Sequence, residues 1–222
     1  MAGFPTRILN PELLESAEPK LAQRNLRDLV RINRWFGGRR AVLRILRDLV
    51  RPLERFSVLD VGAASGDMGK CICGRYRNAT VASLDHRPFH LLGAPPPQVA
   101  ADVFHLPFLP GSFDFVLCSL LLHHFPDRRL IHLIGELRSI ARRALIVLEL
   151  ERHPLAYHFL PMTKWLLRWN PLTVHDGRIS VAAGFRAGEL LSLARASGAT
   201  HALVRKHWPW FRVSLVAPAG EL

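Results

Sequence analysis

The sequence predicts an α/β fold with a doubly wound, mostly parallel sheet, and three observations carry that prediction. Short apolar runs alternate with helical patterns, a turn of small residues follows the first run, and two further runs lie close together near the end. Strand, helix and strand alternating at this spacing are typical of a parallel sheet with helices on both faces. The strand-like runs cover 57–61, 80–84, 113–119, 144–150, 200–206 and 210–216.

Length and composition favour one domain in a cytoplasmic protein. The chain has 222 residues, 49% of them hydrophobic, which is enough to bury a full core. It has no run of about 18 apolar residues, the length that a membrane-spanning helix needs. Its start also lacks the basic and apolar regions of a secretory leader. We therefore expect no membrane partner.

Residues 1–55 are expected to form an N-terminal arm and a helical cap. Three prolines mark 1–19 as a poorly ordered or draped arm. From Leu21, apolar residues and Asn33 recur on one helical face until Gly37-Gly38 ends the helix, and a second helix follows. Because Asn33 lies on the apolar face, we expect it to have a buried partner in the adjoining turn, the cofactor or the substrate.

Residues 56–222 form the second expected unit. Asp127 is expected to be the N-cap of one of its helices. The stretch 152–180 is rich in aromatic and apolar residues and lies above the carboxyl edge of the sheet, where a lid would lie. The last two strands, with Pro209 between them, are expected to form an antiparallel hairpin. The expected helices cover 66–76, 86–92, 127–142 and 186–197.

The main chemical motif is a small-residue loop at the end of the first strand. The stretch Asp60-Val61-Gly62-Ala63-Ala64-Ser65-Gly66 has glycines that permit unusual dihedrals and close approach of a ligand. Such a loop is weak evidence alone, because nicotinamide enzymes share it. Asp85 ends the second strand 23 positions after Gly62, where a carboxylate accepts hydrogen bonds from both ribose hydroxyls. The alternative for Asp85 is a solvated turn residue or helix cap.

Two further motifs complete a resemblance to a known family. Asp102–Phe108 reads acid-x-x-x-Leu-Pro-Phe, and the fourth strand is followed by Leu122-His123-His124. With the glycine loop and Asp85, the sequence resembles the class I S-adenosylmethionine-dependent methyltransferases, in particular their small-molecule, natural-product branch, from about residue 55 to 220. The resemblance implies a Rossmann-like seven-stranded sheet, S-adenosylmethionine as cofactor, and methyl transfer by direct displacement. It also implies a small hydrophobic or aromatic acceptor, phenolic or polyketide-like, as in secondary metabolism.

The resemblance also implies roles for individual residues. The glycine loop would surround the methionine part of the cofactor, and strand-end acids would hold its ribose and adenine. Alanine stands where the family has its middle glycine, which is expected to weaken binding slightly. The implied cofactor-binding residues are Asp60, Gly62, Ala64, Gly66, Asp85, His86, Asp102, Val103 and Ser119.

A hydroxyl acceptor benefits from a general base, although a lone histidine is more often structural. His124 and His153 are the favoured candidates, because both follow strand ends that point toward the cofactor. The wider set of candidates above the sheet edge is His123, His124, Glu149, His153, His158, His175 and Asp176.

Charge and cysteine content leave some alternatives open. The net charge is +12, and 26 of the 30 basic residues are arginine, which reflects either genome composition or an anionic partner. Without an RNA-binding signature, nucleic acid is not the expected partner, but an RNA methyltransferase and a catalytically silent cofactor-binding protein are the competing hypotheses. A hydride-transferring enzyme is disfavoured, because Tyr157 is followed four positions later by Pro161 rather than lysine. Cys71 and Cys73 diverge on a helix, so we expect no metal site.

Overall fold

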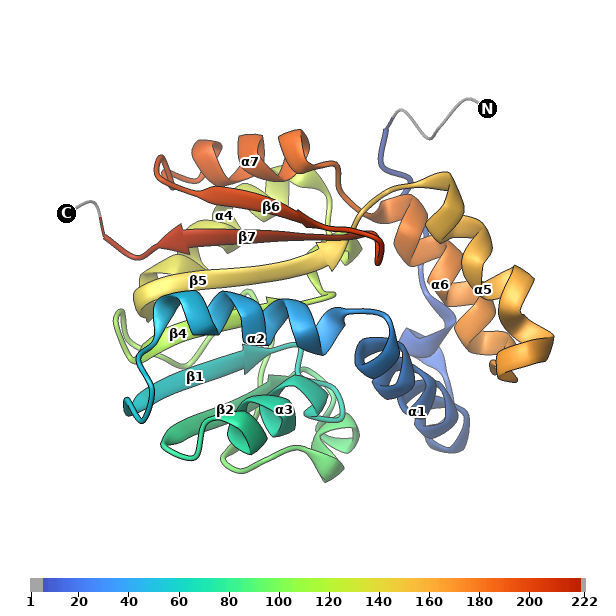
Figure 1. The fold of residues 1–222 in the computed structure, drawn as a ribbon, viewed down its shortest axis with the longest axis horizontal. Helices are drawn as coiled ribbons and strands as arrows, with labels where there is room; N and C mark the ends of the chain where they lie inside the picture. The colour runs from blue at the N-terminus through green and yellow to red at the C-terminus, as the bar shows by residue number, and fades with distance from the viewer. Residues whose placement is uncertain (1–5, 221–222) are drawn as a thin grey trace.

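The computed structural model describes residues 6–220, and its centre is a seven-stranded sheet in the order β3-β2-β1-β4-β5-β7-β6 (Figure 1). Six strands run parallel, and β7 runs antiparallel between β5 and β6. The expected doubly wound sheet with a terminal antiparallel hairpin is therefore confirmed. The strands are β1 Phe56–Val61, β2 Ala79–Asp85, β3 Gln98–Ala100, β4 Phe113–Ser119, β5 Ala141–Leu150, β6 Leu203–His207 and β7 Arg212–Pro218.

The helices form two layers against the sheet and a third group beyond its edge. In Figure 1, α2 and α3 lie in front of the sheet, α4 and α7 lie behind it, and α1, α5 and α6 stand where β1 and β5 end. None of the helices between residues 6 and 220 is long and apolar enough to cross a membrane. The helices are α1 Pro19–Trp35, α2 Gly38–Leu49, α3 Asp67–Arg75, α4 Asp127–Ile140, α5 Pro154–Leu167, α6 Pro171–Ala183 and α7 Ala187–Ala196, and the short 3-10 turns are η1 Leu13–Ser16, η2 Pro88–Gly93 and η3 Leu122–His124.

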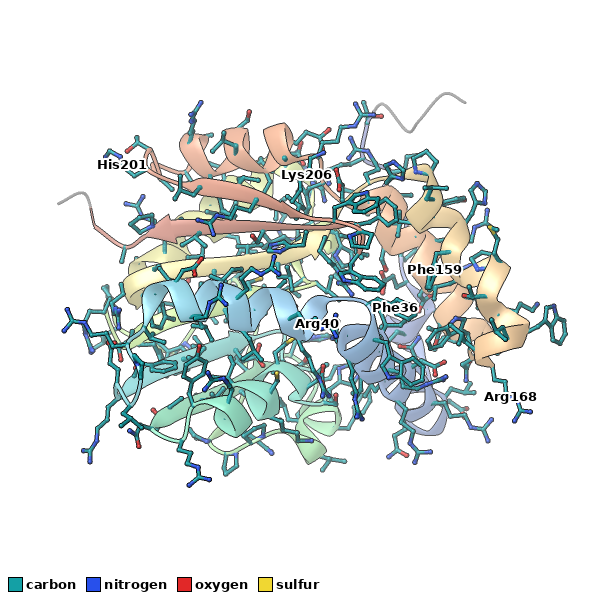
Figure 2. All side chains as sticks on the ribbon, viewed as in Figure 1. Phe36, Arg40, Phe159, Arg168, His201 and Lys206 are labelled. Atoms are coloured by element: carbon teal, nitrogen blue, oxygen red, sulfur yellow. The ribbon has the colours of Figure 1, made fainter. Side chains whose placement is uncertain are left out.

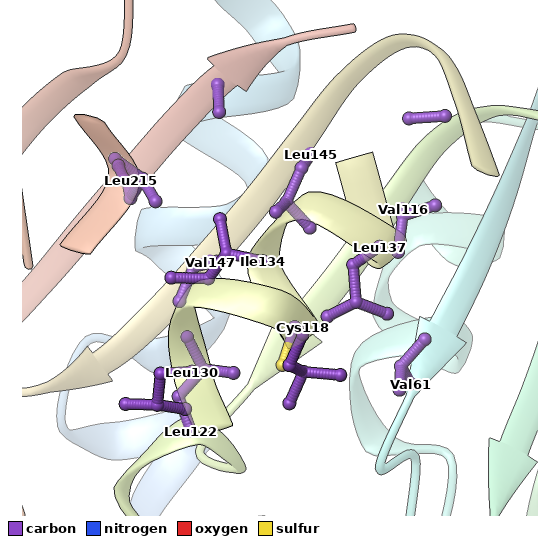
Figure 3. Close-up of a cluster of buried hydrophobic side chains, with 14 of the residues drawn as sticks. Val61, Val116, Cys118, Leu122, Leu130, Ile134, Leu137, Leu145, Val147 and Leu215 are labelled. Carbon is purple, nitrogen blue, oxygen red and sulfur yellow. The ribbon is translucent and has the colours of Figure 1, made fainter. Parts of the chain in front are cut away.

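The core lies on both faces of the central strands. In β5, Leu145 and Val147 pack toward α4, whereas Ile146 and Leu148 pack toward α2. Figure 3 shows the α4 side, where leucines and isoleucines at helical spacing meet the strand side chains. Burial on both faces explains why the strands read as continuous apolar runs. The layers hold the strand ends, and hence the site above them, in fixed positions.

Three local details differ from expectation. The short strand β3 lies where no strand was predicted, and residues 86–92 form the 3-10 turn η2 rather than an α-helix. Asp127 is the first residue of α4, and Pro126 is its N-cap. Proline favours the extended backbone of the N-cap position, and Asp127 in the first turn still benefits from the helix dipole. Its carboxylate also pairs with Arg7.

The described part of the arm lies against α6 and η3. Its backbone amides at Leu13 and Leu14 each donate to the carboxylate of Asp176 at 3.0 Å. Arg7 donates to the carbonyl oxygens of Ala183 at 2.8 Å and Phe125 at 3.0 Å. Residues 1–5 of the expected arm lie outside the described residues. From residue 6 onward the arm is draped over the protein, which was one of the two expected states. It closes one side of the region above the sheet.

The junction between α1 and α2 requires glycine. Gly37 has a φ of 78°, and a Cβ there would lie 2.4 Å from the Trp210 ring. Trp210 belongs to the turn between β6 and β7, so this close approach fixes the terminal hairpin against the end of α1. Phe36 packs edge-on against the same ring at 5.7 Å.

Candidate active site

A cavity of about 1000 Å³ lies over the carboxyl ends of the strands. On the side of β1, β2 and β3, its wall includes Gly62, Asp85 and Asp102. On the side of β5 and β7, its wall comes from α1, α5, α6, the arm and the turn before β7. Phe36 and Phe159 face each other between α1 and α5, with ring centroids 4.7 Å apart (Figure 2). One cavity thus joins a polar half to a largely apolar half.

The loop after β1 has three residues in the left-handed region. Gly62, Ala64 and Gly66 have φ values of 71°, 46° and 67°. Gly62 and Ala64 line the cavity, whereas a Cβ on Gly66 would lie 2.5 Å from the Cα of Ala94. Gly66 therefore allows the η2 segment to pack closely rather than facing the cavity. Ala64 adopts a conformation that costs an L-residue about 1–2 kcal/mol.

Asp85 is the best-ordered acid of the polar half. Its carboxylate accepts hydrogen bonds from the backbone amides of Ala64 and Arg87, both at 3.0 Å, and lies 3.3 Å from Nδ1 of His90. Burial alone would raise its pKa, but the His90 and amide contacts keep the pKa below its ordinary value. His86 is more exposed, with its Nδ1 3.4 Å from the same carboxylate. Both Asp85 and His86 line the cavity.

Asp102 and Val103 lie at the rim beyond β3. Both line the cavity; Asp102 is exposed and Val103 is buried. The Phe104 amide donates to the Asp102 carboxylate at 3.0 Å and lowers its pKa. Asp102 is therefore a charged acceptor open to a ligand.

Asp60 and Ser119 lie below the cavity and are absent from its lining. Asp60 is buried and accepts a hydrogen bond from the Gly69 amide at 3.2 Å, and burial raises its pKa to about 7. Ser119 ends β4, and the next residue, Leu120, turns into the cavity with a φ of 55°. The family resemblance implied a cofactor contact for Ser119, but it is the next residue, Leu120, that reaches the cavity wall.

A buried histidine lies between two carboxylates at the boundary of the two halves. His123 Nδ1 is 2.8 Å from Glu149 Oε2, and His123 Nε2 is 3.4 Å from Glu12 Oε1. Since each ring nitrogen faces an acceptor, the arrangement requires a proton on both nitrogens. Burial would lower the pKa of His123, but Glu149 and Glu12 raise it to about 10. The same contacts keep the pKa of Glu149 below its ordinary value despite complete burial.

His124 stacks on His123, with ring centroids 4.4 Å apart, and lines the cavity. The nitrogens of these two histidines and a Glu12 oxygen lie within 4.8 Å of one another, a spacing that also suits metal ligands. His123 faces Glu149 and Glu12, and its neighbour His124 lines the cavity.

The remaining candidate bases lie outside the cavity lining or make other contacts. His153 is the N-cap of α5, where its Nδ1 accepts a hydrogen bond from the Leu155 amide at 3.2 Å, and its ring stacks on Phe211. His153, His158 and His175 are absent from the cavity lining. Asp176 lines the cavity, but its carboxylate holds the arm.

Arg212, at the start of β7, is a cavity-lining residue that the sequence analysis did not single out. Its side chain is 1% exposed, and its Nη2 donates to Oδ1 of Asn33 at 3.3 Å. Burial lowers its pKa to about 10, while Glu149 opposes that shift. Asn33 thus has the buried partner that was expected, and it is absent from the cavity lining. The sequence carries no signal that would have distinguished Arg212, at the first position of β7, from a surface arginine at a strand end.

The expected lid is a pair of helices. α5 and α6 cover the apolar half; α5 contributes Phe159 and Leu160 to its wall, and α6 contributes Gly177 and Val181. The outer side of α5 exposes Met162, Trp165 and Leu166.

Comparisons with known proteins agree with this architecture. Residues 59–142 match a family model described as a methyltransferase domain. Human N-acetylserotonin methyltransferase in complex with SAM has 17% identity and a TM-score of 0.62, and the alignment covers 90% of this chain and 57% of the human enzyme. Magnesium protoporphyrin IX methyltransferase from Synechocystis PCC 6803 with bound SAH has 19% identity, a TM-score of 0.54 and coverages of 82% and 83%.

A SAM-dependent methyltransferase from Aquifex aeolicus has 12% identity, a TM-score of 0.54 and coverages of 80% and 88%. The chain spans little more than half of several longer neighbours, including the human enzyme. Curated protein sequences gave no match.

Proposed function

We propose that this chain is a class I methyltransferase that transfers a methyl group from S-adenosylmethionine to a small aromatic acceptor; its sheet order and the match of residues 59–142 to a methyltransferase domain support this. One observation supports this best: a single cavity joins the acids at the ends of β2 and β3 to an apolar chamber under α5 and α6. A methyl donor in the polar half and an acceptor in the apolar half would meet above β4.

The polar half fits the donor. Asp85 is ionised and aimed into the cavity, where it would accept hydrogen bonds from the ribose hydroxyls. His90 Nε2 is buried there with no partner among residues 6–220, so a ligand hydroxyl would satisfy it. Asp102 would accept from the adenine amino group, and Val103 would pack against the ring. When bound, S-adenosylmethionine supplies a methyl group activated by its sulfonium charge.

His124 is the proposed general base. It would accept the acceptor's hydroxyl proton as the oxygen forms its bond to the methyl carbon and the carbon–sulfur bond breaks. His123 cannot take that proton, because its two carboxylate partners already hold it as a cation at neutral pH. The remaining rate acceleration would come from holding the two substrates in place, since a direct displacement requires the reacting atoms to be in line and in close contact. His153 remains the second candidate, and its place at the α5 cap makes it the weaker one.

The apolar half favours a flat acceptor. Phe36, Phe159 and Trp210 converge on the same part of the wall, with Phe36 in edge contact with both other rings. Aromatic walls with a few polar groups are typical of sites for small hydrophobic ligands. A phenolic or polyketide-like molecule fits this chemistry.

Isothermal titration with S-adenosylhomocysteine tests the donor site. We expect micromolar binding to the wild type and a loss of about 100-fold or more in Asp85→Asn, because the amide is neutral and has one acceptor oxygen where the carboxylate has two. Asp48→Asn is the matched control, since Asp48 lies on α2 in an exposed ion pair with Arg205. Failure of the folded wild type to bind would contradict the proposed function.

The competing functions predict different results. An RNA methyltransferase with a net charge of +12 would contact RNA phosphates through its basic residues. Its affinity for RNA would therefore fall steeply as the salt concentration rises. A catalytically silent protein would bind S-adenosylhomocysteine yet form no methylated product from a panel of phenols. We expect RNA to bind weakly, and we expect a methylated product to form from at least one phenol.

A further inference from the structure

Arg212 carries a buried charge that has no ion-pair partner among residues 6–220. The residue is 1% exposed, and the one side-chain hydrogen bond that it makes within that range goes from Nη2 to the neutral Oδ1 of Asn33 at 3.3 Å. Nη1 is buried and has no hydrogen-bond partner among residues 6–220. No carboxylate in that part of the chain lies within ion-pair distance of it.

Such an arrangement is costly unless a ligand completes it. A buried guanidinium loses its hydration, and each unbonded N–H adds to the cost. Arg212 lines the cavity, so an anion bound there would face the unsatisfied nitrogen. A guanidinium edge matches the two oxygens of a carboxylate.

The position of Arg212 indicates which ligand supplies the carboxylate. β7 lies three strand spacings from β1, or roughly 14 Å across the sheet, so Arg212 is remote from the glycine loop. Its neighbour along the chain, Phe211, and the turn residue Trp210 belong to the apolar half of the cavity. Glu149 adds a negative charge close enough to oppose the lowering of the Arg212 pKa. A monoanion is therefore favoured over a dianionic phosphate.

We propose that Arg212 binds a carboxylate of the methyl acceptor, so that the acceptor is an aromatic acid whose ring lies against Phe36, Trp210 and Phe211. This inference rests on the proposed function and narrows its substrate class. The amino-acid carboxylate of the cofactor is the other possible source of the same chemistry, and the experiment separates the two.

The test is a calorimetric titration with a matched acid and amide. Wild-type protein saturated with S-adenosylhomocysteine is titrated with benzoate, 1-naphthoate and 9-anthracenecarboxylate, and with the corresponding amides. We expect at least one acid to bind, and its amide to bind at least about tenfold more weakly. In Arg212→Met the affinity for that acid should fall by about 30-fold or more, because a buried charged partner is lost. The affinity for the amide should stay within about twofold.

Two further variants serve as controls. Arg205→Met, an exposed arginine on β6 paired with Asp48, should bind the acid as the wild type does. Arg212→Lys keeps the charge but loses the planar fork, so its affinity should lie between those of the wild type and Arg212→Met. If Arg212→Met does not fold, as judged by circular dichroism, the lysine variant and the acid–amide comparison in the wild type decide the question.

Several outcomes would overturn the proposal. One is that no acid binds to wild type that binds S-adenosylhomocysteine, and another is that acid and amide bind equally well. A third is that Arg212→Met weakens S-adenosylhomocysteine but not 5′-methylthioadenosine, which lacks the amino-acid part; Arg212 would then bind the cofactor's carboxylate. Failure of wild type to bind S-adenosylhomocysteine, with acid discrimination intact, would contradict the donor site alone.

Discussion

The pair formed by His123 and Glu149 makes a quantitative prediction about stability. Glu149 is completely buried, and its Oε2 lies 2.8 Å from His123 Nδ1. The pKa of His123 is about 10 in the folded protein against an ordinary value of 6.5. Between these values the folded state holds a proton that the unfolded state has released. The free energy of unfolding should therefore fall as pH rises, by about 1.4 kcal/mol per pH unit for this one proton.

The sign and the window follow from the raised pKa. The contribution is fully present below pH 6.5, decreases above it, and is lost as pH passes 10. From pH 7 to pH 9 the wild type should lose about 2 kcal/mol from this pair. Removing only one of His123 and Glu149 would leave the other buried charge uncompensated, so the informative change is the double substitution His123→Gln with Glu149→Gln. Glu12 keeps the hydroxyl of Ser180 as a hydrogen-bond partner in that variant. In that variant the free energy of unfolding should no longer contain the decrease with pH that comes from the His123 proton.

The assay is urea unfolding at several pH values, with the free energy of unfolding extrapolated to water. The difference between wild type and double variant cancels the titration of all other groups. His132→Gln is the matched control, because that histidine on α4 has a side chain 79% exposed and should leave the slope unchanged. Equal slopes in the wild type and the double variant would refute the charged assignment of His123.

The remaining predictions concern the reaction and the loop after β1. His124→Gln should reduce kcat by about 100-fold or more for a phenolic acceptor while leaving S-adenosylhomocysteine affinity within about twofold, and a parallel loss of affinity would contradict a role as base. Ala64→Gly should raise the free energy of unfolding by about 1 kcal/mol in urea, because glycine adopts a φ of 46° without the penalty that alanine incurs. A less stable variant would show that the Ala64 methyl group packs favourably enough to outweigh its backbone strain.

Local sequence patterns predicted much of the fold and brought Asp85 to the cavity wall. Asp85 ends a predicted strand, and the ends of parallel strands meet at one edge of a sheet, so its position needs no knowledge of packing. Asp102 follows a strand that was not predicted, and only the family resemblance singled it out. The strand β3 was missed because three residues, Gln98–Ala100, are too few to show a period. Gly66 satisfies the glycine pattern but accommodates Ala94 rather than facing the cavity.

The apolar half depends on contacts that sequence spacing does not encode. Glu12 reaches His123 from 111 positions away, and Asn33 reaches Arg212 from 179 positions away. No period or motif links residues so far apart, and a single buried arginine at a strand end resembles a surface residue until the strand order is known. The different roles proposed for His123 and His124 likewise depend on Glu149 and Glu12, which come from different parts of the fold.

The draped arm has a consequence for the order in which the protein matures. Leu13 and Leu14 leave the ribosome early, yet their partner Asp176 is synthesised more than 160 residues later. β7, inserted between β5 and β6, is made later still. The arm therefore has no docking surface until α6 has been translated. Nascent chains that end before α6 would already carry the loop after β1, but they would lack the helices and the arm that wall the apolar half of the cavity.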